Sequence, residues 1–234
     1  MLRQLTEAVA NALPSQCAVC HAWPARPVCE SCVVRFAQPS SRCRRCAIEV
    51  AAGIPECGRC LAHPPVQDAC FAALAYAYPW STLIAQFKFN GQAGWAGTFA
   101  TLMRSSPWVE PALEEADLVL PMPLSAERLA ERGFNQALLL ARALATRKAD
   151  GALLLRVRHT PAQAALDLKQ RKANVEGAFA VDPLRSHELR GRKVVLVDDV
   201  MTSGASAASA GEVLRRAGAS KLTVLVLART PAPD

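Results

Sequence analysis

Short runs of apolar residues alternate with amphipathic segments along most of this chain. The clearest run covers residues 194–197, four aliphatic side chains that predict a buried parallel strand. Small and hydroxyl residues follow at 202–206, and they predict the start of a helix that reaches about Ala217. Two acidic residues, Asp198 and Asp199, stand between them. The order is therefore strand, acid pair, small-residue turn and helix.

The other apolar segments continue the same alternation. Gly133 interrupts one predicted helix, so either a backbone approaches closely there or a new helix begins after a loop. Because strands and helices alternate and crossovers are right-handed, we expect an α/β fold with a doubly wound, mostly parallel sheet. The predicted strands are 71–78 (an edge strand), 117–120, 153–157, 179–181 and 222–228, and the predicted helices are 80–91 and 125–147.

The length of 234 residues suits one α/β domain with a small accessory module. We expect a module at residues 1–66, with an N-terminal helix and a cysteine-rich part, and the α/β domain at residues 67–234. No apolar run approaches the roughly 20 residues of a membrane span. The first 13 residues have helical spacing rather than the apolar core of a signal peptide. We therefore expect a cytoplasmic protein without a membrane span.

The chain carries 27 basic and 20 acidic residues, a formal net charge of +7. This balance favours a polyanionic partner such as a nucleic acid, but an ordinary solvated basic surface gives the same number. Aromatic side chains that could stack on bases are few, and we expect most of the four tryptophans to lie in the core.

The cysteines carry more information. Eight of the nine lie between residues 15 and 66, in four Cys-x-x-Cys pairs. Two such pairs can surround one tetrahedral ion, and a proline-rich segment with few large aliphatic residues needs a metal to fold. We therefore expect two structural zinc ions rather than disulfides. The simplest pairing is sequential, although an interleaved pairing stays open; the predicted ligands are Cys17, Cys20, Cys29 and Cys32 for one ion and Cys43, Cys46, Cys57 and Cys60 for the other.

Three further features belong to the cysteine-rich part or its border. Cys70 lies outside the pattern beside a predicted strand, and we interpret it as a buried apolar side chain. His21 and His63 could each replace a thiolate, but four thiolates are available for each ion, so both are expected at the surface.

The turn after the predicted strand 194–197 is suited to a phosphate. The first N–H groups of a helix lack partners, and the helix dipole adds positive potential. Asp198 and Asp199 cannot bind a phosphate, but they could accept hydrogen bonds from vicinal sugar hydroxyls. The sequence has no G-x-x-x-x-G-K-[ST] and no G-x-G-x-x-G motif, which excludes a P-loop hydrolase and gives no support to a dinucleotide fold.

Basic residues elsewhere are candidates for the same anion. Arg132 lies in a polar patch early in the predicted helix 125–147, where it could bind an anion. Ordinary surface ion pairs with Glu127 and Glu131 are an equally good interpretation of this arginine. For Lys88 we favour a solvent-exposed residue at a helix end over a phosphate contact. The polar segment 158–174 suits a mobile lid, and its His159 is not expected to be catalytic.

Taken together, these motifs resemble the ComF family, which includes ComFC-like competence proteins and GntX-like proteins. The strand, acid pair and Thr-Ser-Gly-Ala-Ser turn are similar to the phosphoribosyl pyrophosphate motif of type I phosphoribosyltransferases, with Ser203 and Ser206 where many relatives have threonine. The wider resemblance rests on the four Cys-x-x-Cys pairs, Phe87-Lys88-Phe89, Pro121-Met122-Pro123-Leu124, Arg132-Gly133-Phe134-Asn135-Gln136, Arg158 with Thr160 and Gln163, Arg171 with Asn174, and Gly177-Ala178-Phe179.

The resemblance implies a specific site. Asp198 and Asp199 would hold the ribose hydroxyls of phosphoribosyl pyrophosphate, and Arg132 would lie near its pyrophosphate. The 158–174 segment would be the flexible loop, and magnesium would arrive with the substrate. The 5′-phosphate would be cradled by Val200, Met201, Thr202, Ser203, Gly204, Ala205 and Ser206.

Two functions follow from the resemblance. The first is an enzyme that transfers phosphoribose to an acceptor, for which the residues identify neither the acceptor nor a catalytic group. The second is a non-catalytic protein that handles single-stranded DNA during natural transformation, with the fold as a binding platform and other DNA-uptake proteins as partners.

Overall fold

The structure, a computed structural model, describes residues 15–158 and 175–231. The predicted N-terminal helix and most of the predicted flexible loop lie outside the described residues. Contacts within the chain divide it into two compact units, one ending at Gln38 and one beginning at Pro39. The second cysteine cluster thus shares a unit with the sheet, and the predicted boundary after residue 66 stays a prediction.

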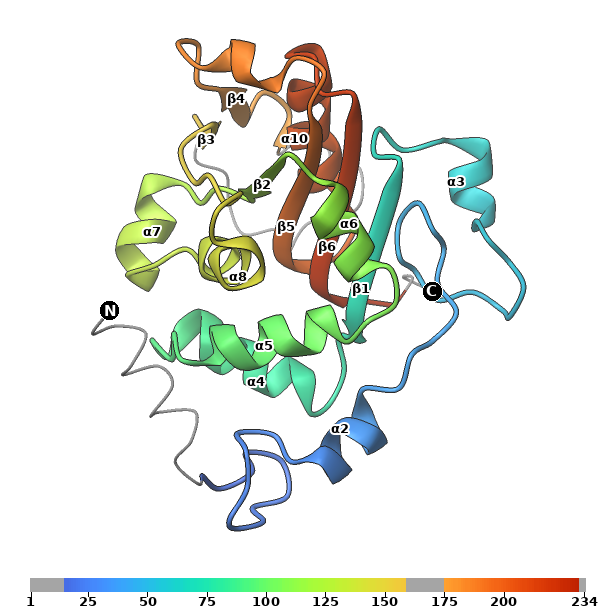
Figure 1. Ribbon diagram of the computed structural model, residues 1–234, viewed down its shortest axis with the longest axis vertical. Helices are drawn as coiled ribbons and strands as arrows, with labels where there is room; N and C mark the ends of the chain where they lie inside the picture. The colour runs from blue at the N-terminus through green and yellow to red at the C-terminus, as the bar shows by residue number, and fades with distance from the viewer. Residues whose placement is uncertain (1–14, 159–174, 232–234) are drawn as a thin grey trace. The chain divides into compact units, whose positions relative to one another are not determined.

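The larger unit is built on a four-stranded parallel sheet in the order β1-β6-β5-β2, as the alternation of the sequence predicts (Figure 1). The central strands are long and almost wholly buried, and the edge position predicted for the first strand is confirmed. The strands are β1 (Ala69–Ala75), β2 (Leu118–Pro121), β5 (Lys193–Met201) and β6 (Lys221–Arg229).

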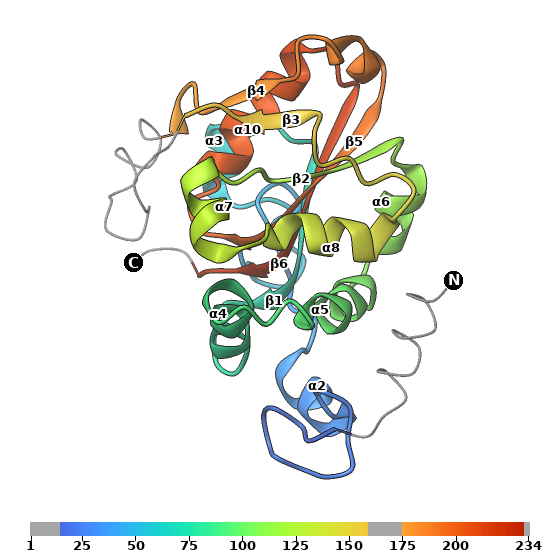
Figure 2. The ribbon, with the colours of Figure 1, turned by 90° about the vertical axis from the view of Figure 1, so that its left-hand side faces the viewer.

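Helices cover both faces of this sheet. One face presents Leu196, Val224 and Val226 to α10 (Ala205–Arg216). The alternate residues of the same strands face the side on which α5 (Trp95–Arg104) and α8 (Gln136–Ala145) pack, in front of the strands in Figure 2. The doubly wound arrangement is therefore present.

The remaining elements lie around this core. The antiparallel pair of β3 (Leu154–Arg156) and β4 (Phe179–Val181) forms a second, small sheet, and α10 packs against β4. The other helices are α2 (Glu30–Phe36) in the smaller unit, and α3 (Gly58–Ala62), α4 (Trp80–Phe89), α6 (Val109–Glu115), α7 (Ala126–Arg132) and the 3-10 helix η2 (Ser186–Leu189) in the larger one.

Gly133 explains why the predicted helix 125–147 is two helices. Its φ of +77° places it in the left-handed region, which glycine tolerates and which ends α7. The side chain of Asn135 then accepts a hydrogen bond from the N–H of Leu138 at 3.2 Å and caps α8. Of the two alternatives, a new helix after a loop is the correct one.

Burial bears out some expectations and corrects others. Cys70 is buried, as predicted, and its Sγ lies 3.9 Å from the sulfur of Met201. Trp80 is buried, but the side chains of Trp23 and Trp108 are 64% and 68% exposed, so the expectation of a mostly buried tryptophan set is wrong. Within the described ranges, no helix is long and apolar enough to cross a membrane.

Candidate functional site

The acid pair lies inside the last part of β5 rather than beyond its end. Asp198 is opposite Val226 of β6 in the parallel ladder, and the strand continues to Met201. One carboxylate oxygen of each aspartate accepts the N–H of the next residue, at 2.8 Å for Asp198 and 2.6 Å for Asp199. Two oriented carboxylates therefore stand at the carboxyl end of a central strand, where ligands of open α/β sheets usually bind.

Lys88 contacts this acid pair directly. Its Nζ lies 2.9 Å from Asp199 Oδ1, and the two side chains are only 16% and 10% exposed. The expectation of a solvent-exposed lysine at a helix end is therefore wrong. The last turn of α4 brings Lys88 to the end of β5, so a residue from a distant part of the sequence joins the site.

Burial and a neighbouring charge perturb the pKa of Asp198. Burial and the neighbouring Asp199 carboxylate raise the pKa of Asp198 to about 7, against the opposing effects of Lys88, the Asp199 N–H and Arg132. Two adjacent carboxylates in a buried position ionise together only at a high cost. The charge of the acid pair therefore changes near neutral pH.

The turn after β5 leads directly into a helix, as the sequence predicts. Gly204, with φ +81°, is the N-cap of α10, which has 12 residues. Ser203 Oγ accepts the N–H of Ala205 at 3.3 Å, and Thr202 and Ser206 are half-buried in the same turn. The first N–H groups and the dipole of a helix of this length favour an anion. The nine predicted positions from Asp198 to Ser206 thus lie in the end of β5, the turn after it and the first two residues of α10.

Arg132 belongs to a network that reaches the same place. Its Nη1 donates to Gln136 Oε1 at 3.2 Å, its guanidinium lies 5.0 Å from the centre of the Phe89 ring, and its buried Nε has no partner among the described residues. Gln136 Nε2 in turn donates to the carbonyl of Lys88 at 3.2 Å. In the described part of the chain, Arg132 makes no ion pair with Glu127 or Glu131.

Two further arginines add positive charge near the acid pair. Burial lowers the pKa of Arg128, and the charge of nearby Arg132 lowers it further. Burial also lowers the pKa of Arg156; nearby Arg128 adds to this effect, and Asp198 opposes it. The guanidinium of Arg156 lies 5.4 Å from the centre of the Phe179 ring. Lys88, Arg132 and Arg156 are thus close enough to the acid pair to interact with its charge, and Arg128 lies near Arg132 and Arg156. We call these four residues the basic cluster (Lys88, Arg128, Arg132 and Arg156).

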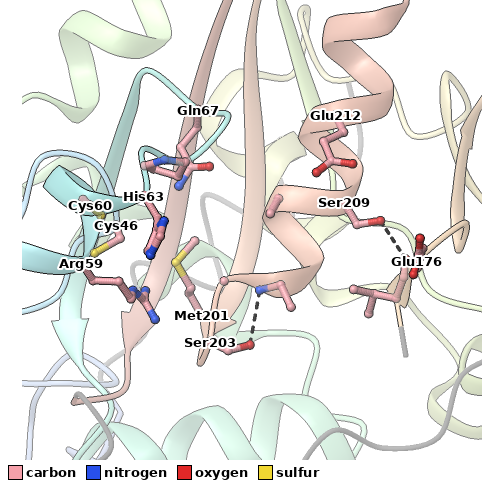
Figure 3. Close-up of a pocket in the computed structure, with 15 residues that line it drawn as sticks. Cys46, Arg59, Cys60, His63, Gln67, Glu176, Met201, Ser203, Ser209 and Glu212 are labelled. Atoms are coloured by element: carbon pink, nitrogen blue, oxygen red, sulfur yellow. Dashed lines mark hydrogen bonds between the residues drawn. The ribbon is translucent and has the colours of Figure 1, made fainter. Parts of the chain in front are cut away.

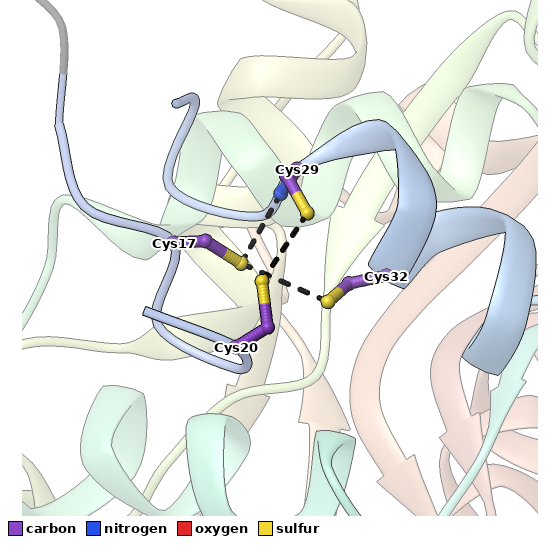
Figure 4. A group of neighbouring side chains, drawn as sticks. All are labelled: Cys17, Cys20, Cys29 and Cys32. Atoms are coloured by element: carbon purple, nitrogen blue, oxygen red, sulfur yellow. Dashed lines mark hydrogen bonds between the residues drawn. The ribbon is translucent and has the colours of Figure 1, made fainter. Parts of the chain in front are cut away.

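The first cysteine cluster gathers four thiols in the smaller unit (Figure 4). The Sγ atoms of Cys17 and Cys32 are 3.8 Å apart, and those of Cys20 and Cys29 are 3.6 Å apart. Tetrahedral zinc at about 2.3 Å from each sulfur would place the sulfurs about 3.8 Å from one another. The spacing and the four-thiolate donor set therefore fit a closed, structural zinc site.

The second cluster repeats this arrangement in the larger unit. Cys43, Cys46, Cys57 and Cys60 all have their Sγ atoms within 4.8 Å of one another, so the structure brings the cysteines together in the sequential pairing. The N–H of Cys57 donates to Cys43 Sγ at 3.3 Å, as the N–H of Cys29 donates to Cys17 Sγ at 3.4 Å.

The resemblance extends to the backbone of the two knuckles. His21 and Ala47 both have positive φ, +61° and +55°, and both donate their N–H groups to the carbonyl of the first cysteine of their cluster. A short helix follows the third cysteine in each case, α2 after Cys29 and α3 after Cys57. His21 and His63 are exposed, and neither belongs to a cluster. The two clusters are therefore two copies of one local fold.

Hydrogen bonds prepare one thiol of each cluster for a metal. Burial alone would raise the pKa of Cys43, but N–H donation from Cys57, Arg45 and Cys46 outweighs it and lowers the pKa to about 7. Burial would likewise raise the pKa of Cys17, but N–H donation from Cys20, Cys29 and Val19 outweighs it and lowers this pKa to about 6. Thiolates rather than thiols ligate metals, so both positions favour the ligand form.

Arg229 connects the second cluster to the anion-binding turn. This side chain is 2% exposed. Its Nε donates to the carbonyl of Cys46 at 3.0 Å, and its Nη1 donates to the carbonyls of Met201 at 3.1 Å and Thr230 at 2.8 Å. One guanidinium thus holds the first knuckle of the cluster, the end of β5 and the end of β6 together.

Known proteins resemble this chain over most of its length. A model of the phosphoribosyl transferase domain matches residues 132–233, which begin at Arg132 and include the acid pair and the turn. The DNA utilization protein YhgH of Salmonella typhimurium is 32% identical over 209 residues, which are 87% of this chain and 90% of that protein. Competence protein F of Haemophilus influenzae is 34% identical over 80% of this chain and 84% of its own length. The chain belongs to the ComF family.

The more distant matches include another competence protein and a solved enzyme structure. The competence protein ComFC of Bacillus subtilis is 30% identical to this ComF-family chain over 138 residues. These are 58% of this chain and 53% of ComFC. The solved structure of an allosteric regulatory enzyme of purine biosynthesis aligns with 58% of this chain and 25% of its own, at 20% identity and a TM-score of 0.37. That structural similarity is too low to bear on function.

Three residues of the ComF-family site were not identified as site residues from the sequence. Arg156 lies at the end of a predicted strand, Arg229 ends the last strand, and Lys88 was assigned to the surface. All three come from element ends that tertiary packing brings together, and no local pattern marks them. The triplet Phe87-Lys88-Phe89 is the one signal that could have favoured Lys88, since it was already part of the family resemblance.

Proposed function

We propose that this protein binds phosphoribosyl pyrophosphate with magnesium and uses it to transfer phosphoribose to a nitrogen acceptor. Asp198 and Asp199 accept hydrogen bonds from the ribose 2′ and 3′ hydroxyls. The backbone of residues 200–206, with the hydroxyls of Thr202, Ser203 and Ser206, cradles the 5′-phosphate. Arg132 lies near the pyrophosphate.

The observation that carries this proposal is the acid pair within a basic cluster. The ligand has vicinal hydroxyls, which suit carboxylates, and two phosphate groups at opposite ends of the ribose, which suit cations and helix N–H groups. The turn at 202–206 supplies the N–H groups, and Lys88, Arg128, Arg132 and Arg156 supply the cations. Few metabolites need both kinds of group so close together.

The chain's own residues contribute mainly position and charge. In transfer, the bond between C1′ and the pyrophosphate oxygen breaks, pyrophosphate leaves with the electron pair, and an acceptor nitrogen forms a bond to C1′. When the ribose hydroxyls replace Lys88 as the partners of Asp199, the ammonium group of Lys88 is released and can contact the pyrophosphate. Orientation of the ribose by the acid pair fixes C1′ relative to the acceptor.

Magnesium fits this site through its oxygen donors. The ion keeps several waters and binds to substrate phosphates more readily than to a protein cage, so it would arrive on the pyrophosphate and the ribose hydroxyls, with Asp198 and Asp199 behind those hydroxyls. When bound, it neutralises the charge that develops on the leaving pyrophosphate.

We also propose that each cysteine cluster holds one structural zinc ion. The four-thiolate sets leave no position for a reacting water, which suits a structural role. Eight reduced thiols suit a reducing compartment such as the cytoplasm.

A second candidate function is the handling of single-stranded DNA, with other DNA-uptake proteins as partners. The relatives named for competence and DNA utilization point to it. The structural observation in its favour is Phe89, 63% exposed, which lies beside Lys88 in the sequence and under the guanidinium of Arg132. Exposed aromatic rings among cations are the usual platforms for unstacked bases.

Calorimetry with zinc-loaded protein, magnesium and phosphoribosyl pyrophosphate tests the binding site. The double variant Asp198→Asn, Asp199→Asn should lose binding without loss of fold. Glu114→Gln, which alters an exposed carboxylate of α6, should bind as the unchanged protein does. Equal affinity in the double variant would show that the site lies elsewhere.

Pyrophosphate release separates the two functions. Release that depends on an added nitrogenous acceptor supports transfer. Absence of release with every base tried, together with salt-dependent binding of single-stranded DNA, would refute the enzyme and favour the second candidate.

A further inference from the structure

A pocket of about 670 Å³ lies between α3, in the second cysteine cluster, and α10 (Figure 3). Its walls come from one compact unit, residues 39–231 of the described chain. It touches the anion-binding turn through Met201, Ser203 and Gly204, but neither aspartate of the acid pair lines it. The volume is in the range of pockets that take small organic ligands.

One end of the pocket has a cationic side chain, Arg59, beside the cluster residues Cys46 and Cys60. Arg59 of α3 extends toward Met201 and Ser203 in Figure 3, and no carboxylate among the described residues pairs with it. The buried guanidinium of Arg229 donates to the carbonyl of Met201, a lining residue, and its other acceptors are also carbonyl and hydroxyl oxygens rather than carboxylates. The first turn of α10 adds positive potential at the same end.

The other end presents hydrogen-bond acceptors. Gln67 is 4% exposed, and its Nε2 donates to the carbonyl of Arg45 at 2.8 Å, which fixes the orientation of the amide. Its Oε1 is consequently left as an acceptor without a partner among the described residues. Figure 3 shows the Gln67 amide on the wall that faces the Glu212 carboxylate of α10. A buried, unpaired acceptor is costly, and a ligand donor that reaches it by displacing the covering atoms would relieve the cost.

The pocket also has apolar walls. Met201, Ala208 and Val175 are among the residues that line it. A complementary ligand therefore has an anionic group at one end, an apolar body, and an N–H donor at the other end. A nucleoside phosphate whose base carries an amino group has these three parts in this order.

We propose that this pocket is a second ligand site, which binds a nucleoside phosphate with the phosphate at Arg59 and the base amino group at Gln67 and Glu212. The apolar ring lies against Met201 and Ala208. A free nucleotide and the 5′-phosphorylated end of a DNA strand offer the same chemistry. The pocket shares part of the turn, Met201 and residues 203–205, with the proposed 5′-phosphate cradle, but neither aspartate of the acid pair lines it.

Calorimetry on the zinc-loaded full chain tests the pocket with adenosine 5′-monophosphate as the probe. The nucleotide should bind, and adenosine, which lacks the phosphate, should bind at least about tenfold more weakly. Arg59→Gln removes the cation, and Ala208→Phe fills the pocket from the half-buried face of α10; each should weaken binding about tenfold or more. Arg192→Gln, an equal loss of charge at a side chain that is 56% exposed and outside the pocket, should have no effect.

Two further measurements distinguish DNA strand ends from free nucleotides as the ligand, and the pocket from the acid pair as the binding site. Tighter binding of a 5′-phosphorylated oligonucleotide than of its 5′-hydroxyl form assigns the pocket to strand ends, whereas equal binding of both assigns it to free nucleotides. The Asp198→Asn, Asp199→Asn variant should keep its affinity for the nucleotide. The proposal is overturned if that variant loses nucleotide binding, if Arg59→Gln and Ala208→Phe bind normally, or if the unchanged protein binds no nucleotide.

Discussion

Replacement of Arg229 by methionine should loosen the second cysteine cluster and the anion-binding turn at the same time. The Arg229 guanidinium donates to the carbonyls of Cys46, Met201 and Thr230 and to the Thr230 hydroxyl. Methionine keeps much of the apolar stem, so the change is concentrated in these four hydrogen bonds.

The size of the effect follows from the acceptors left behind. The carbonyl of Met201 still accepts the Thr230 N–H at 3.1 Å, whereas the carbonyls of Cys46 and Thr230 lose this donor. The buried Cys46 carbonyl left unpaired costs about 1–3 kcal/mol, and the half-buried Thr230 carbonyl adds to this cost. Removal of a desolvated charge offsets part of this cost, so the free energy of unfolding should fall by about 1–3 kcal/mol.

Urea unfolding followed by circular dichroism measures the stability, and zinc release to a chromogenic chelator measures the state of the cluster. Arg229→Met should unfold at lower urea, release zinc faster and bind phosphoribosyl pyrophosphate more weakly than the unchanged protein. Arg216→Met, at a side chain that is 75% exposed, should match the unchanged protein in all three measurements. If Arg229→Met also matches it, the guanidinium does not couple the cluster to the turn.

Two further predictions concern protons and metal. Because the pKa of Asp198 is raised to about 7, its carboxylate forms as the pH rises from about 6 to about 8, and affinity for phosphoribosyl pyrophosphate should rise with it. In carboxyl-carbon NMR titrations, Asp199→Asn should move the Asp198 midpoint to lower pH and Lys88→Met should move it higher; an unmoved midpoint in both would contradict the coupling. Atomic absorption should find two zinc ions per chain, and one in either Cys20→Ser or Cys57→Ser; two ions in either variant would rule out independent four-thiolate sites.

Local patterns were sufficient for the sheet. The aliphatic runs 194–197 and 222–228 predict the two central strands because buried parallel strands need apolar side chains on both faces. The acid pair and its turn were also predictable, since strand end, carboxylates and helix start are consecutive in sequence. No element is predicted between residues 92 and 116, although Phe99, Leu102 and Met103 of α5 have the spacing of a buried helix face.

Contacts between distant segments could not be predicted in this way. Lys88 has the context of an ordinary helix-end lysine, and only the packing of α4 against the end of β5 brings it to Asp199. Arg229 follows a run of apolar residues and has no local partner that would indicate burial. The pairing of the cysteines was open for a related reason, because equal spacings permit more than one arrangement until the backbone is known.

Both edges of the parallel sheet are occupied by other parts of the chain. At one edge, the Cys70 N–H of β1 donates to the carbonyl of Arg44 in the second cysteine cluster. At the other, Val119 of β2 forms a parallel bridge with Ala149, donating to the Lys148 carbonyl and accepting from the Asp150 N–H. An uncovered sheet edge invites another strand to pair with it, which leads to aggregation or to strand exchange. Loss of the second cluster should therefore expose β1 as a surface for self-association as well as remove a metal.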